Sequence, residues 1–309
     1  MTFAFLFPGQ GSQSLNMMDG FSAAVVKDTF DEASEALGDD LWAMLKADSS
    51  DTINQTVNTQ PLMLAAGVAT FRAWLALGGA MPSVVAGHSL GEYSALVAAD
   101  ALDFDDAVRL VRLRAEAMQS AVPVGTGAMA AVLGLEDADI VAACTEAAQG
   151  DVVEAVNFNA PGQVVIAGSL AAVERAIAAC KARGAKRALP LPVSAPSHCA
   201  LMKPAALKLA DALEGISISV PTVPVLHNAD VASYTDPVQI RDALVRQLYS
   251  PVRWTETVRK LAADGVIRQA ECGPGKVLAG LNKRIDSSLS TLALTDDAAL
   301  AAALGSLNG

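Results

Sequence analysis

The segment Gly87-His88-Ser89-Leu90-Gly91 constrains the fold of this chain more than any other part of its sequence. The apolar residues 84–86 before it predict a buried strand, and the pattern of residues 93–100 after it predicts a helix. A serine at such a strand-to-helix turn takes a strained backbone conformation that lifts its hydroxyl clear of the sheet. The helix N-terminus supplies N–H groups and partial positive charge for an oxyanion. We therefore predict that Ser89 is a nucleophile, although an Ala- and Gly-rich turn can match this pattern by chance.

Length and charge limit the classes of fold and partner. The 309 residues suit one large α/β domain, or a large domain with a smaller one inserted, and 52% hydrophobic residues provide a sizeable core. A net charge of −11 argues against nucleic acid or an anionic membrane as a general partner. Residues 1–8 are apolar but too short for a targeting segment, and residues 61–80 are interrupted by Arg72 and glycines. We expect a buried strand and a core helix there, and no membrane span.

The cysteines carry information about compartment and metal binding. Four are scattered along the chain without a C-x-x-C pair: Cys144, Cys180, Cys199 and Cys272. This spacing fits neither a zinc site nor a disulfide framework. Reduced thiols are typical of the cytoplasm, so we expect a cytoplasmic protein without a metal.

Outside residues 126–193, short apolar strands alternate with amphipathic helices. Residues 3–7 and 83–86 have strand patterns, and residues 60–77 and 105–119 have helix patterns. This alternation is typical of a doubly wound parallel sheet with helices on both faces, and the G-x-S-x-G turn makes it similar to an α/β-hydrolase.

The pattern changes between residues 125 and 193. Strands are predicted at 128–133, 152–157, 163–167 and 188–193, and helices at 138–148 and 171–183. Asn159-Ala160-Pro161-Gly162 is a strong turn signal between the two middle strands. The order β-α-β-β-α-β is the ferredoxin-like plan. We predict an inserted ferredoxin-like domain at residues 126–193, within a large domain of residues 1–125 and 194–309.

A nucleophilic serine needs a base, and the chain has only three histidines. His88 adjoins Ser89 but points elsewhere on a tight turn, which favours a supporting role. His227 ends an apolar run and could be an ordinary pocket or core residue. His198 follows the last strand of the inserted domain, where the chain returns to the large domain beside the cleft. We predict His198 as the base.

Several segments together resemble the malonyl-CoA:acyl carrier protein transacylase family of bacterial fatty-acid synthesis. They follow the family order over nearly the whole chain: Phe7-Pro8-Gly9-Gln10-Gly11-Ser12-Gln13, Thr59-Gln60-Pro61, Gly87-His88-Ser89-Leu90-Gly91-Glu92-Tyr93, Arg114 with Met118-Gln119, Asn157-Phe158-Asn159-Ala160-Pro161-Gly162-Gln163, Ser194-Ala195-Pro196-Ser197-His198, and Gln247-Leu248-Tyr249-Ser250-Pro251-Val252. The resemblance implies a ping-pong acyltransferase that moves malonyl from coenzyme A to the phosphopantetheine thiol of acyl carrier protein.

The resemblance also implies roles for individual residues. Ser89 would carry the malonyl group and His198 would move the proton. The backbone N–H groups of Gln10 and Leu90 would form the oxyanion hole. Arg114 would hold the malonyl carboxylate through a bidentate ion pair. By pattern alone Arg114 would be a solvated arginine, yet its spacing from neighbouring apolar residues places it near the buried face of its helix.

Other implied roles concern orientation and the cleft. Gln247 would orient the histidine through its backbone carbonyl in place of a carboxylate, and this neutral partner stabilises imidazolium less. Gln60, Asn159 and Gln163 would line the acyl and coenzyme A cleft. No cofactor is implied, since the coenzyme A thioester is a substrate. His227 departs from the family pattern, which has a smaller polar residue before Asn228.

An acidic enzyme needs a local basic surface to meet an acidic carrier protein. One candidate cluster is Lys181, Arg183, Lys186 and Arg187, and the other is Lys276, Lys283 and Arg284. The first could instead complement a helix C-terminus. We expect a monomer.

Three alternatives remain open from the sequence. One is a stand-alone acyltransferase of polyketide synthesis or of a malonate decarboxylase. Another is a serine hydrolase or thioesterase, and the third is a non-enzymatic binding module. Arg114 argues against a simple esterase, which has no need of a buried cation, and the pair Ser89 and His198 argues against a binding module.

Overall fold

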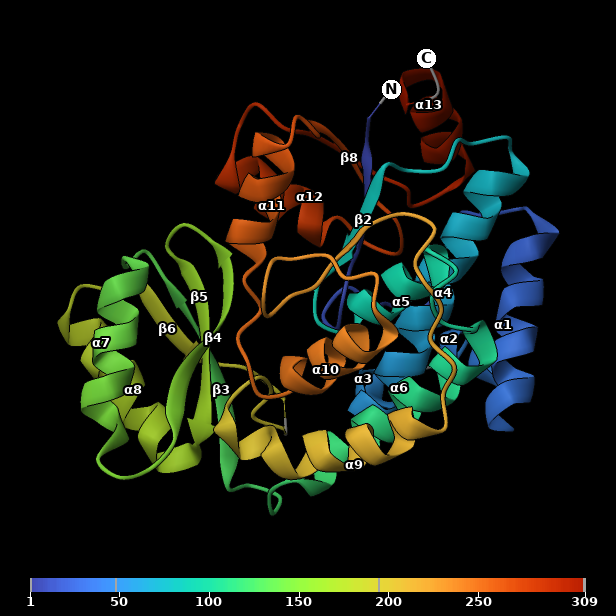
Figure 1. The fold of residues 1–309 in the computed structure, drawn as a ribbon. Helices are drawn as coiled ribbons and strands as arrows, with labels where there is room; N and C mark the ends of the chain where they lie inside the picture. Colours follow the sequence, from blue (N-terminus) through green and yellow to red (C-terminus); the bar gives the residue numbers. More distant parts are fainter. Residues whose placement is uncertain (1, 48, 194, 308–309) are drawn as a thin grey trace.

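The computed structural model describes residues 2–47, 49–193 and 195–307. Its larger sheet is parallel throughout, with the strand order β7-β2-β1-β8-β9 (Figure 1). The strands of this sheet are β1 (Ala4–Phe7), β2 (Val84–Gly87), β7 (Val225–Leu226), β8 (Arg268–Glu271) and β9 (Ser290–Ala293). The predicted parallel sheet is confirmed.

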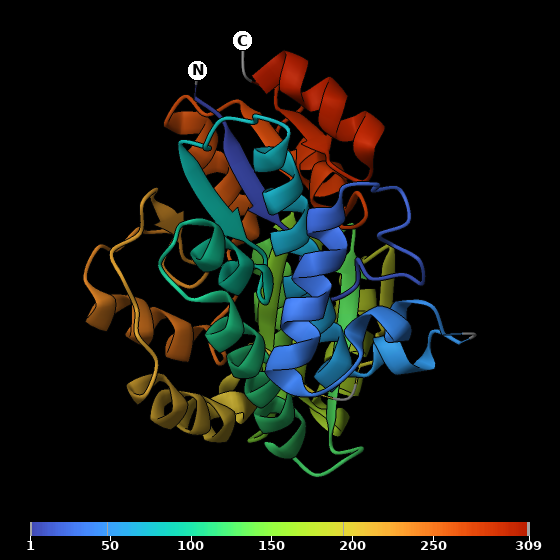
Figure 2. The same ribbon diagram turned by 90° about the vertical axis from the view of Figure 1, so that its right-hand side faces the viewer.

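Helices cover both faces of the parallel sheet, because the side chains of β1 alternate between two buried layers. Phe5 and Phe7 belong to the core under the N-terminal helices, whereas Ala4 and Leu6 pack with Trp254 and Leu278 on the other face. Figure 2 shows the N-terminal helices (blue) in front of the sheet. On the first side lie α1 (Ala24–Leu37), α2 (Leu41–Leu45), α3 (Asp51–Asn54), α4 (Thr56–Ala76), α5 (Gly91–Ala98), α6 (Phe104–Ser120), η1 (Ala200–Met202), α9 (Lys203–Glu214), α10 (Pro237–Gln247) and α13 (Asp297–Leu307), and on the second α11 (Trp254–Ala263) and α12 (Val277–Ile285).

The smaller sheet is antiparallel and follows the predicted β-α-β-β-α-β order. It is built from β3 (Gly127–Leu133), α7 (Asp137–Ala148), β4 (Val153–Ala160), β5 (Gln163–Ser169), α8 (Leu170–Ala182) and β6 (Arg187–Pro190). Its strand order is β4-β5-β3-β6, which is the ferredoxin-like arrangement. Both helices pack on one face and share a separate core with the strands. We call this part of the chain the small unit.

The small unit is fixed to the rest of the protein through its edge strand β4. The backbone of Val252 pairs with β4 on both sides: Phe158 N–H donates to Val252 O (3.0 Å), and Val252 N–H donates to Val156 O (2.8 Å). The Thr255 hydroxyl also donates to Phe158 O (3.0 Å). These bonds join the edge of the small sheet to the segment that leads into α11.

Several predicted element ends differ from the structure: β4 extends past residue 157 to Ala160 and β5 past residue 167 to Ser169, and two further differences have a clear cause. The last strand of the small unit was expected over 188–193 but ends at Pro190, because Pro190 and Pro192 have no N–H to donate to a ladder. Helix α4 begins one turn before the expected residue 60, since Asn58 and Thr59 already donate backbone bonds to Gln55.

The domain limits at 126 and 193 remain a prediction, and Ser194 lies outside the described residues. Within the described ranges, no helix has the length and apolar character needed to cross a membrane.

Candidate active site

Ser89 lies on the sharp turn between β2 and α5, with a left-handed φ of 52°. The two flanking glycines make this turn possible. A Cβ at Gly87 would lie 1.9 Å from the carbonyl carbon of Gly91, and a Cβ at Gly91 would lie 2.1 Å from Phe7 O. No side chain fits at either position. The predicted strained turn is therefore present, and its cause is close approach of backbone on both sides.

His198 is placed directly against Ser89. Its Nε2 lies 2.8 Å from Ser89 Oγ, and its Nδ1 lies 2.8 Å from the backbone oxygen of Gln247. A carbonyl oxygen can only accept, so Nδ1 carries the proton and Nε2 is free to accept one from the serine. The backbone N–H of His198 donates to Leu248 O (3.0 Å), which fixes the loop.

The electrostatic surroundings keep His198 neutral. Burial lowers the pKa of His198 to about 3, and the positive charge of Arg114 acts in the same direction. The imidazole is therefore present as the free base at neutral pH. The backbone carbonyl of Gln247 orients the ring without adding the negative charge that a carboxylate partner would bring.

Arg114 is buried beside the serine, with 1% of its surface exposed. Its Nη2 donates to Gln247 Oε1 (2.9 Å) and lies 3.2 Å from Ser89 Oγ, while Nη1 donates to Gln60 Oε1 (2.8 Å). The guanidinium lies 5.5 Å from the centre of the Tyr93 ring. Burial lowers the pKa of Arg114, but a guanidinium still keeps its charge at neutral pH. The alternative of a solvated arginine on the helix surface is wrong.

A pocket of about 180 Å³ opens over these groups. Gln10, Gln60, Leu90 and Asn159 line it together with the serine, the histidine and the arginine. The backbone N–H groups of Gln10 and Leu90 have no hydrogen-bond acceptor among residues 2–47, 49–193 and 195–307. Two backbone donors without a partner, in residues that line the same pocket as Ser89, are what an oxyanion hole for this serine would require.

The remaining predicted residues lie at different distances from the chemistry. His88 supports the wall of the pocket, because its Nε2 lies 2.8 Å from Asn159 Oδ1 and its ring packs on Trp254. Gln163 does not line the pocket, and its side-chain oxygen accepts a hydrogen bond from Arg284. The predicted role of Gln163 in substrate binding stays a prediction.

Two residues behind the serine were not found from the sequence. Asn228 accepts from the Ser89 backbone N–H through Oδ1 (2.7 Å) and donates from Nδ2 to Gly87 O (2.6 Å). Glu92 is fully buried and contacts His227. The available signal was composition: Glu92 is the one charged residue of α5, Gly91–Ala98, whose other positions are small or apolar apart from Tyr93 and Ser94. Among residues 2–47, 49–193 and 195–307, no group of three or more His, Cys, Asp or Glu side chains is placed to hold a metal ion.

Comparisons with known proteins agree with this geometry. The sequence model of the acyl transferase domain family matches residues 4–307. The malonyl CoA-acyl carrier protein transacylase of Salmonella typhimurium is 60% identical over 304 residues, which cover 98% of each chain. The crystal structure of an acyl carrier protein S-malonyltransferase from Vibrio cholerae superposes with a TM-score of 0.96 at 58% identity, covering 98% of this chain and 100% of that one.

A third comparison concerns a complex. The structure of a type II polyketide synthase acyl-carrier protein with its malonyl-transacylase matches with a TM-score of 0.98 at 56% identity, covering 99% of this chain and 100% of the other. Full-length similarity at these identities, together with a strand-to-helix serine turn of the expected geometry, makes this chain a member of the malonyl CoA-acyl carrier protein transacylase family.

Proposed function

We propose that this protein transfers malonyl from malonyl-CoA to the phosphopantetheine thiol of acyl carrier protein through a malonyl ester on Ser89. The observation that carries the proposal is the position of Arg114, a buried residue whose Nη2 lies 3.2 Å from Ser89 Oγ beside the pocket. A buried cation at that distance binds the free carboxylate of a short acyl group whose thioester carbon meets the serine.

The first half-reaction makes the acyl-enzyme. Ser89 gives its proton to Nε2 of His198 as its oxygen attacks the thioester carbonyl carbon. The N–H groups of Gln10 and Leu90 stabilise the oxyanion of the tetrahedral intermediate. The C–S bond then breaks, and the coenzyme A thiolate takes the proton from His198. The products are the malonyl ester of Ser89 and coenzyme A.

The second half-reaction reverses these steps with another thiol. The phosphopantetheine thiol gives its proton to His198, and its sulfur attacks the ester carbonyl. The C–O bond to Ser89 breaks, and the serine oxygen takes back the proton. Because Gln247 offers a neutral carbonyl in place of a carboxylate, the base is weak, and the acyl ester outlasts attack by water until a thiol arrives.

The carboxylate site distinguishes this function from a simple hydrolase. Gln60 and Gln247 hold Arg114 through neutral oxygens, so the charge of the guanidinium is not consumed by a direct acidic partner among the described residues. An esterase of uncharged acyl groups gains nothing from a buried cation that has no acidic group in direct contact with it, and such a cation is costly to fold. The family relatives leave polyketide synthesis and fatty-acid synthesis both compatible with this chemistry, and we favour fatty-acid synthesis on the similarity to the transacylases named above.

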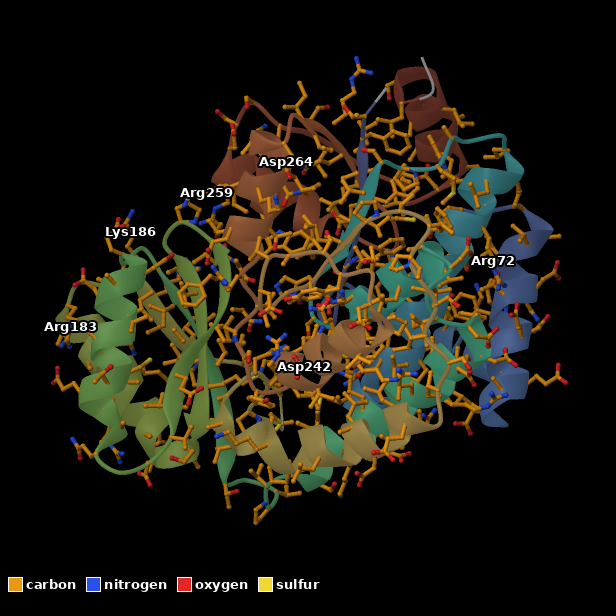
Figure 3. All side chains as sticks on the ribbon, viewed as in Figure 1. Arg72, Arg183, Lys186, Asp242, Arg259 and Asp264 are labelled. Atoms are coloured by element: carbon orange, nitrogen blue, oxygen red, sulfur yellow. The ribbon has the colours of Figure 1, made fainter. Side chains whose placement is uncertain are left out.

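The carrier protein would dock on one of the two basic clusters. In the first cluster Arg183 already pairs with Glu146, which leaves Lys181, Lys186 and Arg187 as its exposed cations. Figure 3 shows Arg183 and Lys186 on the outer side of the small unit, with Arg259 of α11 at the neighbouring edge. In the second cluster Arg284 donates to Gln163, while Lys276 and Lys283 are exposed.

Two further parts of the proposal concern the state of the protein. We propose that it works as a monomer, since Ser89, His198 and Arg114 all come from one chain. We also propose a cytoplasmic location, which is supported by the four cysteines, all buried as free thiols.

The proposal is tested by intact-mass measurement after mixing the protein with malonyl-CoA. The wild type should gain one malonyl group, and the Ser89→Ala variant should gain none. Ser94→Ala, at a buried serine in the helix α5 that follows the Ser89 turn, is the matched control and should leave the adduct in place. An adduct that persists on the Ser89→Ala protein would place the nucleophile elsewhere.

A further inference from the structure

A buried carboxylate lies behind the active site and takes no part in the steps above. Glu92, in the first turn of α5, has 0% of its surface exposed. Its Oε1 lies 2.7 Å from His227 Nδ1, and its Oε2 accepts from the Asn228 backbone N–H (2.9 Å) and from Gln247 Nε2 (2.9 Å). A buried charge requires such partners, and the two N–H groups that donate to Oε2 favour the carboxylate as an anion.

The proton on His227 is also placed by its surroundings. His227 Nε2 is buried and has no hydrogen-bond partner in the part of the chain that the structure describes. A proton on that atom would be buried and unpaired, whereas a proton on Nδ1 is donated to Glu92. His227 is therefore a neutral donor, and the pair keeps the negative charge of Glu92.

Gln247 lies between this anion and the cation of the active site. Its Nε2 donates to Glu92 Oε2 and to Ser89 O (2.9 Å each), while its Oε1 accepts from Arg114 Nη2 (2.9 Å). The reverse orientation of the amide would turn its oxygen against a carboxylate and a carbonyl, so the hydrogen bonds fix the direction. Glu92 makes no direct ion pair with Arg114 among the described residues.

The separation of Glu92 from Arg114 affects how Arg114 can bind a substrate. A carboxylate in contact with Arg114 would occupy the same donors as the carboxylate of the substrate and compete with it. A carboxylate one side chain away still offsets the buried positive charge, because Coulomb attraction falls slowly with distance in a poorly hydrated interior. The Gln247 side chain therefore connects Glu92 to Arg114 through hydrogen bonds and still leaves the guanidinium open to the carboxylate of a substrate.

We propose that Glu92 is the internal counter-ion of Arg114, and that the Gln247 amide holds it one side chain away so that the guanidinium stays open to the carboxylate of the acyl donor. Glu92 is thus a positioning residue, and it does not touch the reacting atoms. The inference rests on the proposed function, because it takes Arg114 as the group that binds the malonyl carboxylate.

The first test removes the charge and keeps the shape. In Glu92→Gln, the amide oxygen can accept from Asn228 and Gln247, while the amide nitrogen can donate to His227 Nδ1 only with the ring proton on the unpaired Nε2, a cost that is the same in both salts used below. Arg114 then lacks its counter-ion, and an added anion should replace it. Sodium malonate should raise the thermal unfolding midpoint of Glu92→Gln more than that of the wild type, relative to sodium chloride at equal ionic strength. Equal shifts in the two proteins would contradict the inference.

The second test moves the charge instead of removing it. The double variant Glu92→Gln with Gln247→Glu exchanges acid and amide, and it places the carboxylate against Arg114. We expect the ratio of malonyl to acetyl transfer, measured as kcat/KM for the two coenzyme A donors, to fall at least about tenfold relative to Glu92→Gln alone. An unchanged ratio, or an equal loss for both donors, would show that the spacing does not set the preference.

The control separates this inference from the function itself. Wild-type protein that fails to form a malonyl adduct on Ser89 would contradict the proposed function. A normal wild-type adduct, combined with malonate shifts and donor ratios that do not respond to the variants, would contradict only the role of Glu92.

Discussion

The two sheets of this protein contribute different things to one pocket. The parallel sheet and its helices supply the groups to which we assign the chemistry: Ser89 on its turn, Arg114 on α6 and the backbone of Gln247 at the end of α10. The small unit contributes lining residues, among them Met129 and Asn159. The first set is fixed by buried hydrogen bonds and by backbone contacts that exclude any Cβ, whereas the second forms a wall. Changes in the parallel-sheet part should therefore affect the chemistry, and changes in the small unit should affect binding.

Among the substitutions that test this division between the two sheets, we expect the largest effect from Arg114→Ala. Loss of the guanidinium leaves the malonyl carboxylate without a partner in a desolvated pocket, which costs about 3–5 kcal/mol of transition-state stabilisation. Neutral acetyl should lose far less, so the preference between donors should shift toward acetyl or invert. Steady-state kcat/KM for malonyl-CoA and acetyl-CoA measures the effect. Equal losses for the two donors would mean that Arg114 supports the fold and does not bind the substrate.

A second prediction concerns acidification. An ordinary histidine, with a pKa near 6.5, would lose about thirtyfold of its free base between pH 8 and pH 5. Because burial lowers the pKa of His198 to about 3, its base form persists, and acylation of Ser89 should stay nearly constant over that range. Rapid-quench measurement of the acylation rate with malonyl-CoA tests this. A decline centred near pH 6.5 would show that His198 is solvated in the working enzyme.

For the pocket residues of the small unit, we predict a smaller effect, and Asn159→Ala tests it. The substitution removes the side-chain partner of His88 Nε2 (2.8 Å) and one polar group from the pocket, which costs about 1–2 kcal/mol. The loss should fall mainly on KM for malonyl-CoA, with kcat changed little. Asn157→Ala, on the same strand and also lining the pocket, is the matched comparison. A loss confined to kcat would mean that the small unit takes part in the chemistry.

The smallest effect is expected at the surface. Reversing two charges in the cluster that docks the carrier should raise the carrier KM several-fold, because exposed charges act weakly and mainly on encounter. One double variant is Lys186→Glu with Arg187→Glu, and the other is Lys276→Glu with Lys283→Glu.

Acylation of Ser89 by malonyl-CoA should be nearly unchanged in both double variants, and the wild-type carrier KM should rise with salt. Normal carrier KM values in both variants would exclude both clusters as the docking surface.

The same division explains what could be predicted from sequence. Ser89 and His198 could be selected as candidates from the sequence, because the turn motif is local and the chain has only three histidines. The two sheets followed from hydrophobic periodicity and turn residues. Glu92 has only a weak signal in the sequence, as the one charged residue of α5, because its partners Asn228 and Gln247 lie more than a hundred residues away along the chain. The end of β6 was predicted too late, because the apolar run 188–193 was given more weight than its two prolines, which end the strand at Pro190.

The most direct test of the account is a single-turnover transfer followed by mass spectrometry of both proteins. Wild-type protein is loaded with malonyl-CoA, freed of excess donor, and mixed with acyl carrier protein that carries its phosphopantetheine arm. The account predicts one malonyl group on Ser89, located by peptide mapping, which then leaves the enzyme as the carrier gains it. An adduct on another residue, or a carrier that gains malonyl only while malonyl-CoA is present, would contradict it.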